Sequence, residues 1–161
     1  MRLPLIFISK FVGTVSLGLL TGVSYTLSTI ALPSLLHLST APTAAQTHAF
    51  LAAHSRGAQK LLSGISVGAL TFAFLFSPRR ARHPYLIWTA LVAGAAWAPG
   101  LERLTAHYFI GPEAEIDVDA GVNGEVVRRG VEQDRAVEGV RAGIWGLAFA
   151  MGLIGIWGDG A

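Results

Sequence analysis

Four apolar stretches, separated by polar connections, dominate the chain. The first covers residues 11–32 and holds 22 consecutive residues without a charge. As a helix it would rise about 33 Å, enough to cross the hydrocarbon core of a bilayer. The other three, residues 61–77, 84–100 and 142–158, hold 17 residues each, at the short end of the range for a membrane span. The pattern predicts an all-α integral membrane four-helix bundle that forms one domain over residues 1–161.

Prolines mark the ends of these stretches. Pro33 follows the first stretch and is predicted to end its helix. Pro78 and three arginines leave only a short turn before Pro84, so the second and third spans are expected to form an antiparallel hairpin. Pro99 and Gly100 are predicted to close the third span.

Two longer connections are polar. In residues 33–60, Thr43-Ala44-Ala45-Gln46 has the capping-box pattern, so a helix is expected from near Thr43 into the second span. Residues 101–141 are predicted to be a polar acidic loop, with a helix that begins near Glu125 as an alternative for its last part. This segment contains nine of the ten acidic residues of the chain: Glu102, Glu113, Glu115, Asp117, Asp119, Glu125, Glu132, Asp134 and Glu138.

Glycines recur at the spacing that lets membrane helices approach one another closely. Three glycine pairs have the GxxxG spacing. The apolar stretch at 84–100 has Gly94 between Ala90 and Ala98 at the same spacing. Because four spans supply partners within one chain, packing between helices of the same chain is favoured over dimerisation. The predicted helix-packing residues are Gly18, Gly22, Gly64, Gly68, Gly94, Gly139 and Gly143.

Composition and charge agree with a membrane protein. Hydrophobic residues make up 52% of the chain and charged residues 14%, and the mean hydropathy is +0.53. Soluble domains carry about 25% charged residues. The formal net charge of +2 gives no reason to expect a nucleic acid partner. The chain has no cysteine, which excludes disulfides and thiol chemistry.

The distribution of charge predicts an orientation. Four spans would place both termini on one side, with five basic residues and one acid and hence a net charge of +4. The other side would hold seven basic and nine acidic residues, a net charge of −2. The basic count alone favours the opposite orientation, but the tight arginine cluster between short spans favours cytosolic termini. Lys10 interrupts the first apolar run, which favours an uncleaved first span over a signal peptide.

The sequence offers no recognisable site for chemistry. No ionisable residue lies inside the four apolar stretches, whereas proton and ion pathways need such residues. The acidic run at 113–119 lacks the central glycine and distal glutamate of a calcium loop. We therefore expect no catalytic, cofactor-binding or metal-binding residues and no small-molecule substrate. From these features the expected partners are the lipid bilayer and other membrane proteins.

Four sequence pieces together resemble a known family. They are SKFVGTVSLGLLTGVSYTLSTIALPSLL (9–36), SPRRARHPYL (77–86), VNGEVVRRGVE (122–132) and VRAGIWGLAFAMGLIGIWGDGA (140–161). The set resembles filamentous-fungal members of the autophagy-related protein thirty-three family. The resemblance implies a protein of the mitochondrial outer membrane that acts in mitophagy and carries no known catalytic residue. It also implies autophagy proteins among the partners. The most distinctive string is Arg82-His83-Pro84-Tyr85-Leu86.

Two other functions remain open from the sequence. One is a small four-span membrane enzyme similar to the anthrone-oxygenase-like family, with His83 or His107 near its active site. It would need a polar pocket in which histidines and Tyr85 or Tyr108 converge. The other is a structural scaffold that organises membrane proteins through its glycine faces.

Direct binding to the ubiquitin-like autophagy modifier is not expected. Such binding typically uses an exposed aromatic-x-x-aliphatic segment that adds a strand to a sheet of the partner. The segments at 72–75 and 88–91 have the spacing but lie in predicted spans, and the segment at 108–111 ends in glycine.

Overall fold

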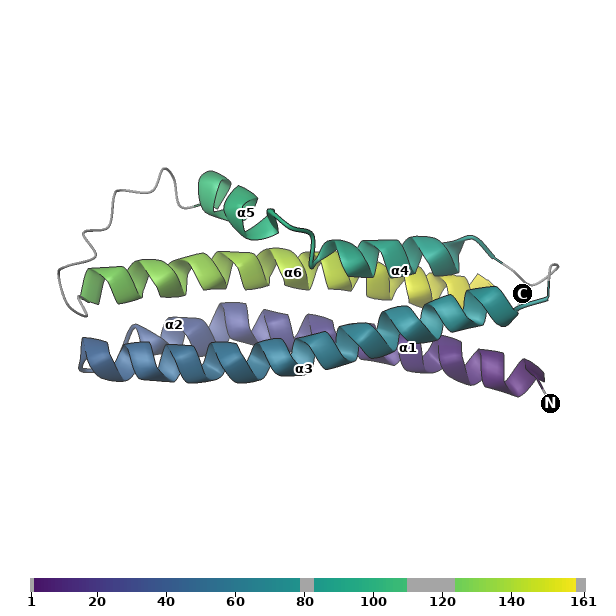
Figure 1. Cartoon of the computed structure of the whole chain (residues 1–161), viewed down its shortest axis with the longest axis horizontal. Coiled ribbons are helices and arrows are strands. Elements are labelled where there is room, and N and C mark those ends of the chain that lie inside the picture. The colour runs from purple at the N-terminus through teal and green to yellow at the C-terminus, as the bar shows by residue number, and fades with distance from the viewer. Residues whose placement is uncertain (1, 79–82, 110–123, 159–161) are drawn as a thin grey trace.

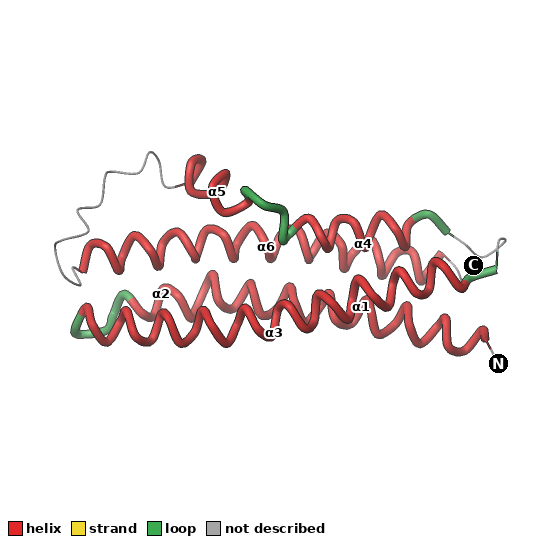
Figure 2. Tube along the Cα trace, in the orientation of Figure 1, coloured by secondary structure: helices red, strands yellow, loops and turns green. Residues whose placement is uncertain are grey.

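The computed structural model describes residues 2–78, 83–109 and 124–158, and the regular elements within them are helices. The prediction of an all-α fold is therefore confirmed for these residues (Figures 1 and 2). In chain order the elements are α1 (Arg2–Thr26), a π-helical turn (Leu27–Ala31), α2 (Leu32–Leu35), α3 (Ala41–Phe76), α4 (Tyr85–Ala95), α5 (Leu101–Phe109) and α6 (Gly124–Gly158).

The helices form an elongated bundle. Helix α1 packs along both α3 and α6, α4 packs against α3 and α6, and α5 contacts α6. Figure 1 shows α4 covering one part of α6 and α5 lying further along it, towards the other end of the bundle. The first and last described residues lie at the same end, together with the end of α3 and the start of α4. The antiparallel pairing predicted for the second and third spans is present as α3 and α4.

The buried positions along each long helix are alternately three and four residues apart. This spacing is typical of helices that pack side by side over many turns. In α3 it gives Gln59, Ser63, Ser66, Leu70 and Ala73, followed by Ser77 just beyond the helix. In α1 it gives Ile6, Lys10, Gly13, Leu17, Leu20 and Ser24. In α6 it gives Val131, the half-buried Asp134, Glu138, Arg141, Trp145, Ala148 and Gly152.

Pro33 does not end the first helix, which corrects the sequence prediction. The chain forms a π-helical turn just before it, in which the Leu32 N–H donates to the Leu27 carbonyl, five residues back. The turn makes room for the proline ring, and α2 continues the helix to Leu35. A π-turn inserts one residue, so the buried face shifts to Leu32 and Leu35.

Three helices are long and apolar enough to cross a membrane by length and composition. They cover Pro4–Leu35, Ala41–Phe76 and Gly124–Gly158. The predicted span at 84–100 is shorter than expected, because α4 ends at Ala95. Its 11 residues rise about 16 Å, roughly half of a hydrocarbon core. Pro99 limits the residues before it, and Gly100 has a φ of 98°, which suits glycine and turns the chain into α5.

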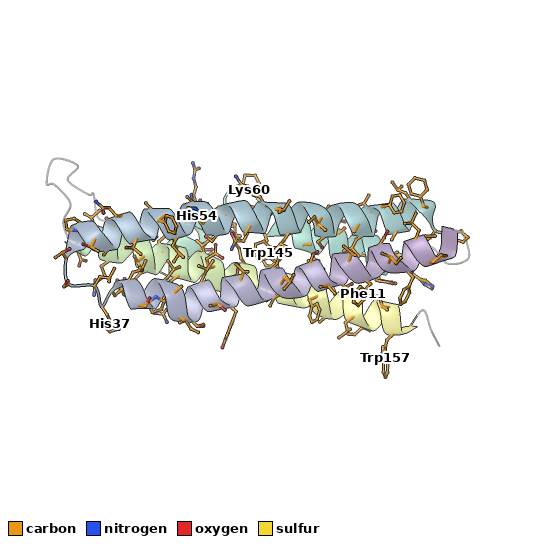
Figure 3. The ribbon with its side chains drawn as sticks, turned by 90° about the horizontal axis from the view of Figure 1, so that it is seen from below. Phe11, His37, His54, Lys60, Trp145 and Trp157 are labelled. Atoms are coloured by element: carbon orange, nitrogen blue, oxygen red, sulfur yellow. The ribbon has the colours of Figure 1, made fainter. Side chains whose placement is uncertain are left out.

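The bundle has an apolar half and a polar half. We define the apolar half as α1 up to residue 23, α3 from Leu61, α4, and α6 from residue 142. Large apolar side chains cover its outside, including Phe11 (58% exposed), Leu61 (66%), Ile154 (72%) and Trp157 (85%). Figure 3 shows Phe11 and Trp157 in this half. A surface of this kind is typical of contact with lipid.

The polar half comprises the described residues 24–60, 96–109 and 124–141, and much of the predicted 101–141 loop is helical there. Helix α5 occupies its start, and α6 begins at Gly124, as the alternative near Glu125 anticipated. The helix predicted from near Thr43 into the second span is present as α3. A small apolar core of Leu32, Leu35 and Val131 holds this half together. The acidic run at 113–119 and the arginines at 79, 80 and 82 lie outside the described residues.

Candidate functional site

Four polar side chains from three helices meet inside the bundle. We call Ser24 on α1, Gln59 on α3, and Glu138 and Arg141 on α6 the buried polar cluster. Ser24 and Gln59 are fully buried, and Glu138 and Arg141 are 7% and 5% exposed. Charged residues are almost never this buried unless they are paired, so the cluster is an unusual feature of the fold.

The Glu138 carboxylate is the centre of the cluster. Its Oε2 atom accepts hydrogen bonds from Ser24 Oγ and from Gln59 Nε2, both at 2.6 Å. Its Oε1 atom accepts from Arg141 Nη1 at 2.9 Å. Gln59 Nε2 also donates to Ser24 Oγ at 2.9 Å. The carboxylate thus joins α1, α3 and α6 at one level through charge-assisted hydrogen bonds, which are stronger than neutral ones.

Arg141 connects the cluster to the segment after α4. Its Nη2 atom donates to Glu102 Oε1 on α5 at 3.2 Å, and its Nε atom donates to the Ala96 carbonyl at 3.4 Å. The guanidinium carbon lies 4.8 Å from the centre of the Trp97 ring. Trp97 in turn donates from Nε1 to Ser63 Oγ on α3 at 3.1 Å. Arg141 therefore orients the turn that leads from α4 to α5.

Trp145, one turn further along α6, makes a second side-chain hydrogen bond to a backbone carbonyl at the end of α4. Its indole Nε1 donates to the Ala93 carbonyl at 3.1 Å. The N–H of Trp97 bonds to the Gly94 carbonyl, so it does not close the helical bond to Ala93. Two side chains of α6, Arg141 and Trp145, thus satisfy carbonyls at the end of α4 that would otherwise lack a partner. This explains how so short a helix is held in place.

The cluster lies where the apolar half begins. Gln59 is two residues before Leu61 on α3, and Arg141 directly precedes the apolar part of α6. Sequence reasoning missed it because uncharged stretches were sought and charges at their edges were read as solvated. The available signal was the alternating spacing along α6, which places Glu138 and Arg141 on the same face as Trp145 and Ala148.

A second polar contact joins α3 to α6 within the polar half. His48 Nε2 lies 3.0 Å from Asp134 Oδ2, and Arg56 Nη2 lies 3.7 Å from the same oxygen. His54 instead pairs with the Phe50 carbonyl of its own helix. Within residues 2–78, 83–109 and 124–158, no group of three His, Asp or Glu side chains has the arrangement of a metal site.

The exposed start of α6 carries paired charges. Glu125 accepts a hydrogen bond from Arg129 Nε at 3.0 Å, and Arg128 Nε lies 3.2 Å from its other oxygen. The hydrogen bond from Arg129 and the charge of Arg128 lower the pKa of Glu125 below its usual value. A negative charge in the first turn of a helix is favourable, so these residues stabilise the beginning of α6.

The structure separates the predicted packing glycines into two groups. Gly18 lies against the ring of Phe149, and Gly139 lies against Ser28, so these two sit at contacts between helices. A methyl group at any of the other five would meet no atom within 4 Å: Gly22, Gly64, Gly68, Gly94 and Gly143. The tightest contacts are at glycines that the GxxxG search did not select, namely Gly13 against Leu70, Gly152 against Thr14 and Gly155 against Tyr85.

The distinctive string at 82–86 has a structural explanation at the start of α4. Leu86 is fully buried in the core, and His83 and Pro84 are exposed. The ring of Tyr85 fits against Gly155 of α6, and Lys10 Nζ lies 5.8 Å from the ring centre. Tyr85 therefore joins α1, α4 and α6, whereas the buried polar cluster joins α1, α3 and α6 at the level where α4 ends. Arg82 lies outside the described residues.

Comparison with known proteins identifies the family. The model of the family described as autophagy-related protein 33 matches residues 6–101. The curated autophagy-related protein 33 of Gibberella zeae is 36% identical, over 94% of this chain and 90% of its own length. The chain belongs to the autophagy-related protein 33 family. No solved structure matches it.

The residues matched by the autophagy-related protein 33 model include most of α1 and all of α2 to α4. They hold Ser24 and Gln59, together with Lys10 and Tyr85. Glu138 and Arg141 of the buried polar cluster lie beyond the matched residues, on α6. The matched residues therefore pack against a helix, α6, that lies beyond the match.

The contact between Tyr85 and Gly155 gives a first prediction. Gly155→Ala should lower the free energy of unfolding by about 1–3 kcal/mol, because the added methyl group overlaps the Tyr85 ring. Thermal unfolding of the full chain in detergent micelles, followed by circular dichroism, measures the change. Gly143→Ala on the same helix is the matched control and should leave the midpoint unchanged or slightly raised. Equal effects of the two substitutions would contradict the contact.

Proposed function

We propose that this chain is a non-enzymatic integral membrane protein of the mitochondrial outer membrane that supports selective autophagy of mitochondria. Membership of the autophagy-related protein 33 family carries the proposal, since the similarity covers nearly the whole chain. The apolar half would lie in the bilayer, with four helical segments crossing or entering it. The polar half would stand outside and offer charged surface for protein contacts.

The positions of the histidines and tyrosines support a non-enzymatic role over the anthrone-oxygenase-like alternative. That alternative needs histidines and Tyr85 or Tyr108 in one polar pocket. His83 and Tyr85 lie at the start of α4, whereas His107 and Tyr108 lie on α5, further along the bundle (Figure 1). These described side chains are thus divided between two places. The scaffold alternative keeps one supporting observation, the exposed Gly64 and Gly68 on α3.

The experiment that tests the proposed function follows mitochondrial turnover in a deletion strain. A matrix-targeted fluorescent reporter is followed into the vacuole during prolonged stationary growth, and bulk autophagy is measured in parallel. We expect mitochondrial delivery to fall while bulk autophagy continues, and re-expression of the full chain to restore delivery. Normal delivery in the deletion strain would contradict the proposal.

An orientation with both termini in the cytosol forms part of the proposal. The basic excess on the terminal side supports it, and it would place the polar half in the space between the two mitochondrial membranes. Because the chain has no cysteine, single cysteines can report each side. On intact mitochondria, we expect a membrane-impermeant maleimide to label Ala161→Cys and to leave Thr40→Cys unlabelled until the outer membrane is opened. Labelling of Thr40→Cys alone would place the polar half in the cytosol.

The proposed role does not include direct binding to the ubiquitin-like autophagy modifier through an added strand. The two segments with aromatic-x-x-aliphatic spacing, Phe72–Leu75 and Trp88–Leu91, lie within α3 and α4. Their backbone groups are used within helices and cannot also pair with a sheet edge. We expect the purified full chain in micelles to retain no modifier in a pull-down, with a peptide of the receptor type as the positive control. Retention of the modifier would contradict this prediction.

A further inference from the structure

A groove lies beside the buried polar cluster, between α3, α6 and the turn that joins α4 to α5. Its volume is about 390 Å³. Four cationic side chains line it (Arg56, Lys60, Arg103 and Arg141), together with Glu102 and the indole of Trp97. A surface depression with four cations and one acid is an attractive place for an anion.

Two of the four cations have their charge compensated within the protein. Arg141 pairs with Glu138 and Glu102, and Arg56 lies 3.7 Å from Asp134. Lys60 and Arg103 are exposed, and neither makes an ion pair with any residue that the structure describes. Their positive charges are therefore available to a ligand that enters the groove.

The groove opens at the level where the surface changes from polar to apolar. Lys60 directly precedes Leu61, where the apolar part of α3 begins, and Figure 3 shows Lys60 near the middle of the bundle, projecting away from it. Arg141 directly precedes the apolar part of α6, and Trp97 follows the apolar helix α4. Trp and basic side chains at the ends of apolar helices mark the headgroup level of a bilayer.

We propose that this groove binds the phosphate of an anionic phospholipid headgroup. Lys60 and Arg103 would contact the phosphate oxygens, and Trp97 would lie at the level of the glycerol backbone. Leu61, which is 66% exposed, begins the apolar surface along which the acyl chains would extend. Basic pockets beside membrane helices are known to bind such headgroups. The proposal goes beyond the proposed function and depends only on the chain lying in a membrane.

The test uses the purified full chain in detergent micelles. Short-chain phosphatidylglycerol is titrated and the unfolding midpoint is followed by circular dichroism, with phosphatidylcholine of the same chain length and inorganic phosphate as separate titrations. We expect phosphatidylglycerol to raise the midpoint and the other two to leave it unchanged. An equal rise with inorganic phosphate would show a free-phosphate site, and an equal rise with phosphatidylcholine a general lipid effect; either result overturns the proposal.

A pair of variants then locates the site. The double variant Lys60→Gln, Arg103→Gln should bind phosphatidylglycerol about thirtyfold more weakly, the value expected when two cations near an anionic lipid surface are lost. Arg128→Gln, Arg129→Gln removes the same charge from the exposed start of α6 and should keep the affinity of the unaltered protein. Equal affinity of the two double variants would overturn the proposal. Should the first variant unfold, Lys60→Gln alone must lose affinity that Lys60→Arg retains.

Discussion

Replacing Arg141 by alanine is expected to lower the free energy of unfolding by about 3–5 kcal/mol. The substitution leaves the Glu138 carboxylate buried without its cationic partner, and removing one member of a buried pair costs this much. It also removes the hydrogen bonds to Glu102 and to the Ala96 carbonyl. Denaturant unfolding of the full chain in micelles, followed by tryptophan fluorescence and circular dichroism, measures the loss.

Two further variants separate the buried pair from a general effect of charge. Arg129→Ala removes an exposed arginine that pairs with Glu125 four residues earlier, and should change the stability little, because solvent screens an exposed ion pair. The double variant Glu138→Leu, Arg141→Met removes both buried charges and should recover most of the stability. An Arg141→Ala protein as stable as Arg129→Ala would show that the buried pair is not essential for folding.

Replacing Trp145 by alanine should destabilise the apolar half by about 3–5 kcal/mol. Trp145 is fully buried in the larger core cluster, and its ring centre lies 6.1 Å from that of Trp97. The substitution leaves a cavity and also removes the hydrogen bond to the Ala93 carbonyl. Thermal unfolding in micelles measures the change, and α4 should become the helix most susceptible to proteolysis.

Trp157 provides the control for the substitution of Trp145. Trp157 lies on the same helix and is 85% exposed, so Trp157→Ala should change the unfolding midpoint little. Trp145→Phe retains most of the ring and should cost about 1–3 kcal/mol, mainly for the unsatisfied Ala93 carbonyl. Equal effects of Trp145→Ala and Trp157→Ala would mean that the ring at 145 does not hold the bundle together.

The sequence predicted the continuity of α3, and that of α6 only as an alternative to a loop. Helix α3 begins at Ala41, two residues before Thr43, with Thr40 as its N-cap and no capping hydrogen bond from a side chain. No proline interrupts residues 43–76. The segment after Glu125 is likewise free of proline, so α6 runs from Gly124 to Gly158. Hydropathy alone placed the start of an apolar span inside each helix, directly after Lys60 in α3 and directly after Arg141 in α6. A helix that passes from polar to apolar surroundings has no backbone signal at that boundary, which is why residues 124–141 were predicted to be a loop.

The course of the chain around Pro33 and the buried charges could not be predicted in the same way. A proline signals that one helical hydrogen bond is lost, but a π-turn can absorb the loss, and the Ser28 hydroxyl bonds across to the Arg135 carbonyl at that turn. The charge of Glu138 looked solvated because its partners Ser24 and Gln59 are distant in sequence. Family resemblance supplied the functional expectation, since no residue pattern indicated a chemical step.

The continuity of α3 and α6 has a mechanical consequence. Each helix extends about 54 Å or slightly less, and neither is interrupted by a flexible linker where the polar half meets the apolar half. The buried polar cluster holds α1, α3 and α6 together at that level through hydrogen bonds. We expect a partner that pulls on the polar end to tilt the embedded end as a rigid body, so that a force applied outside the bilayer is delivered to the surrounding lipid.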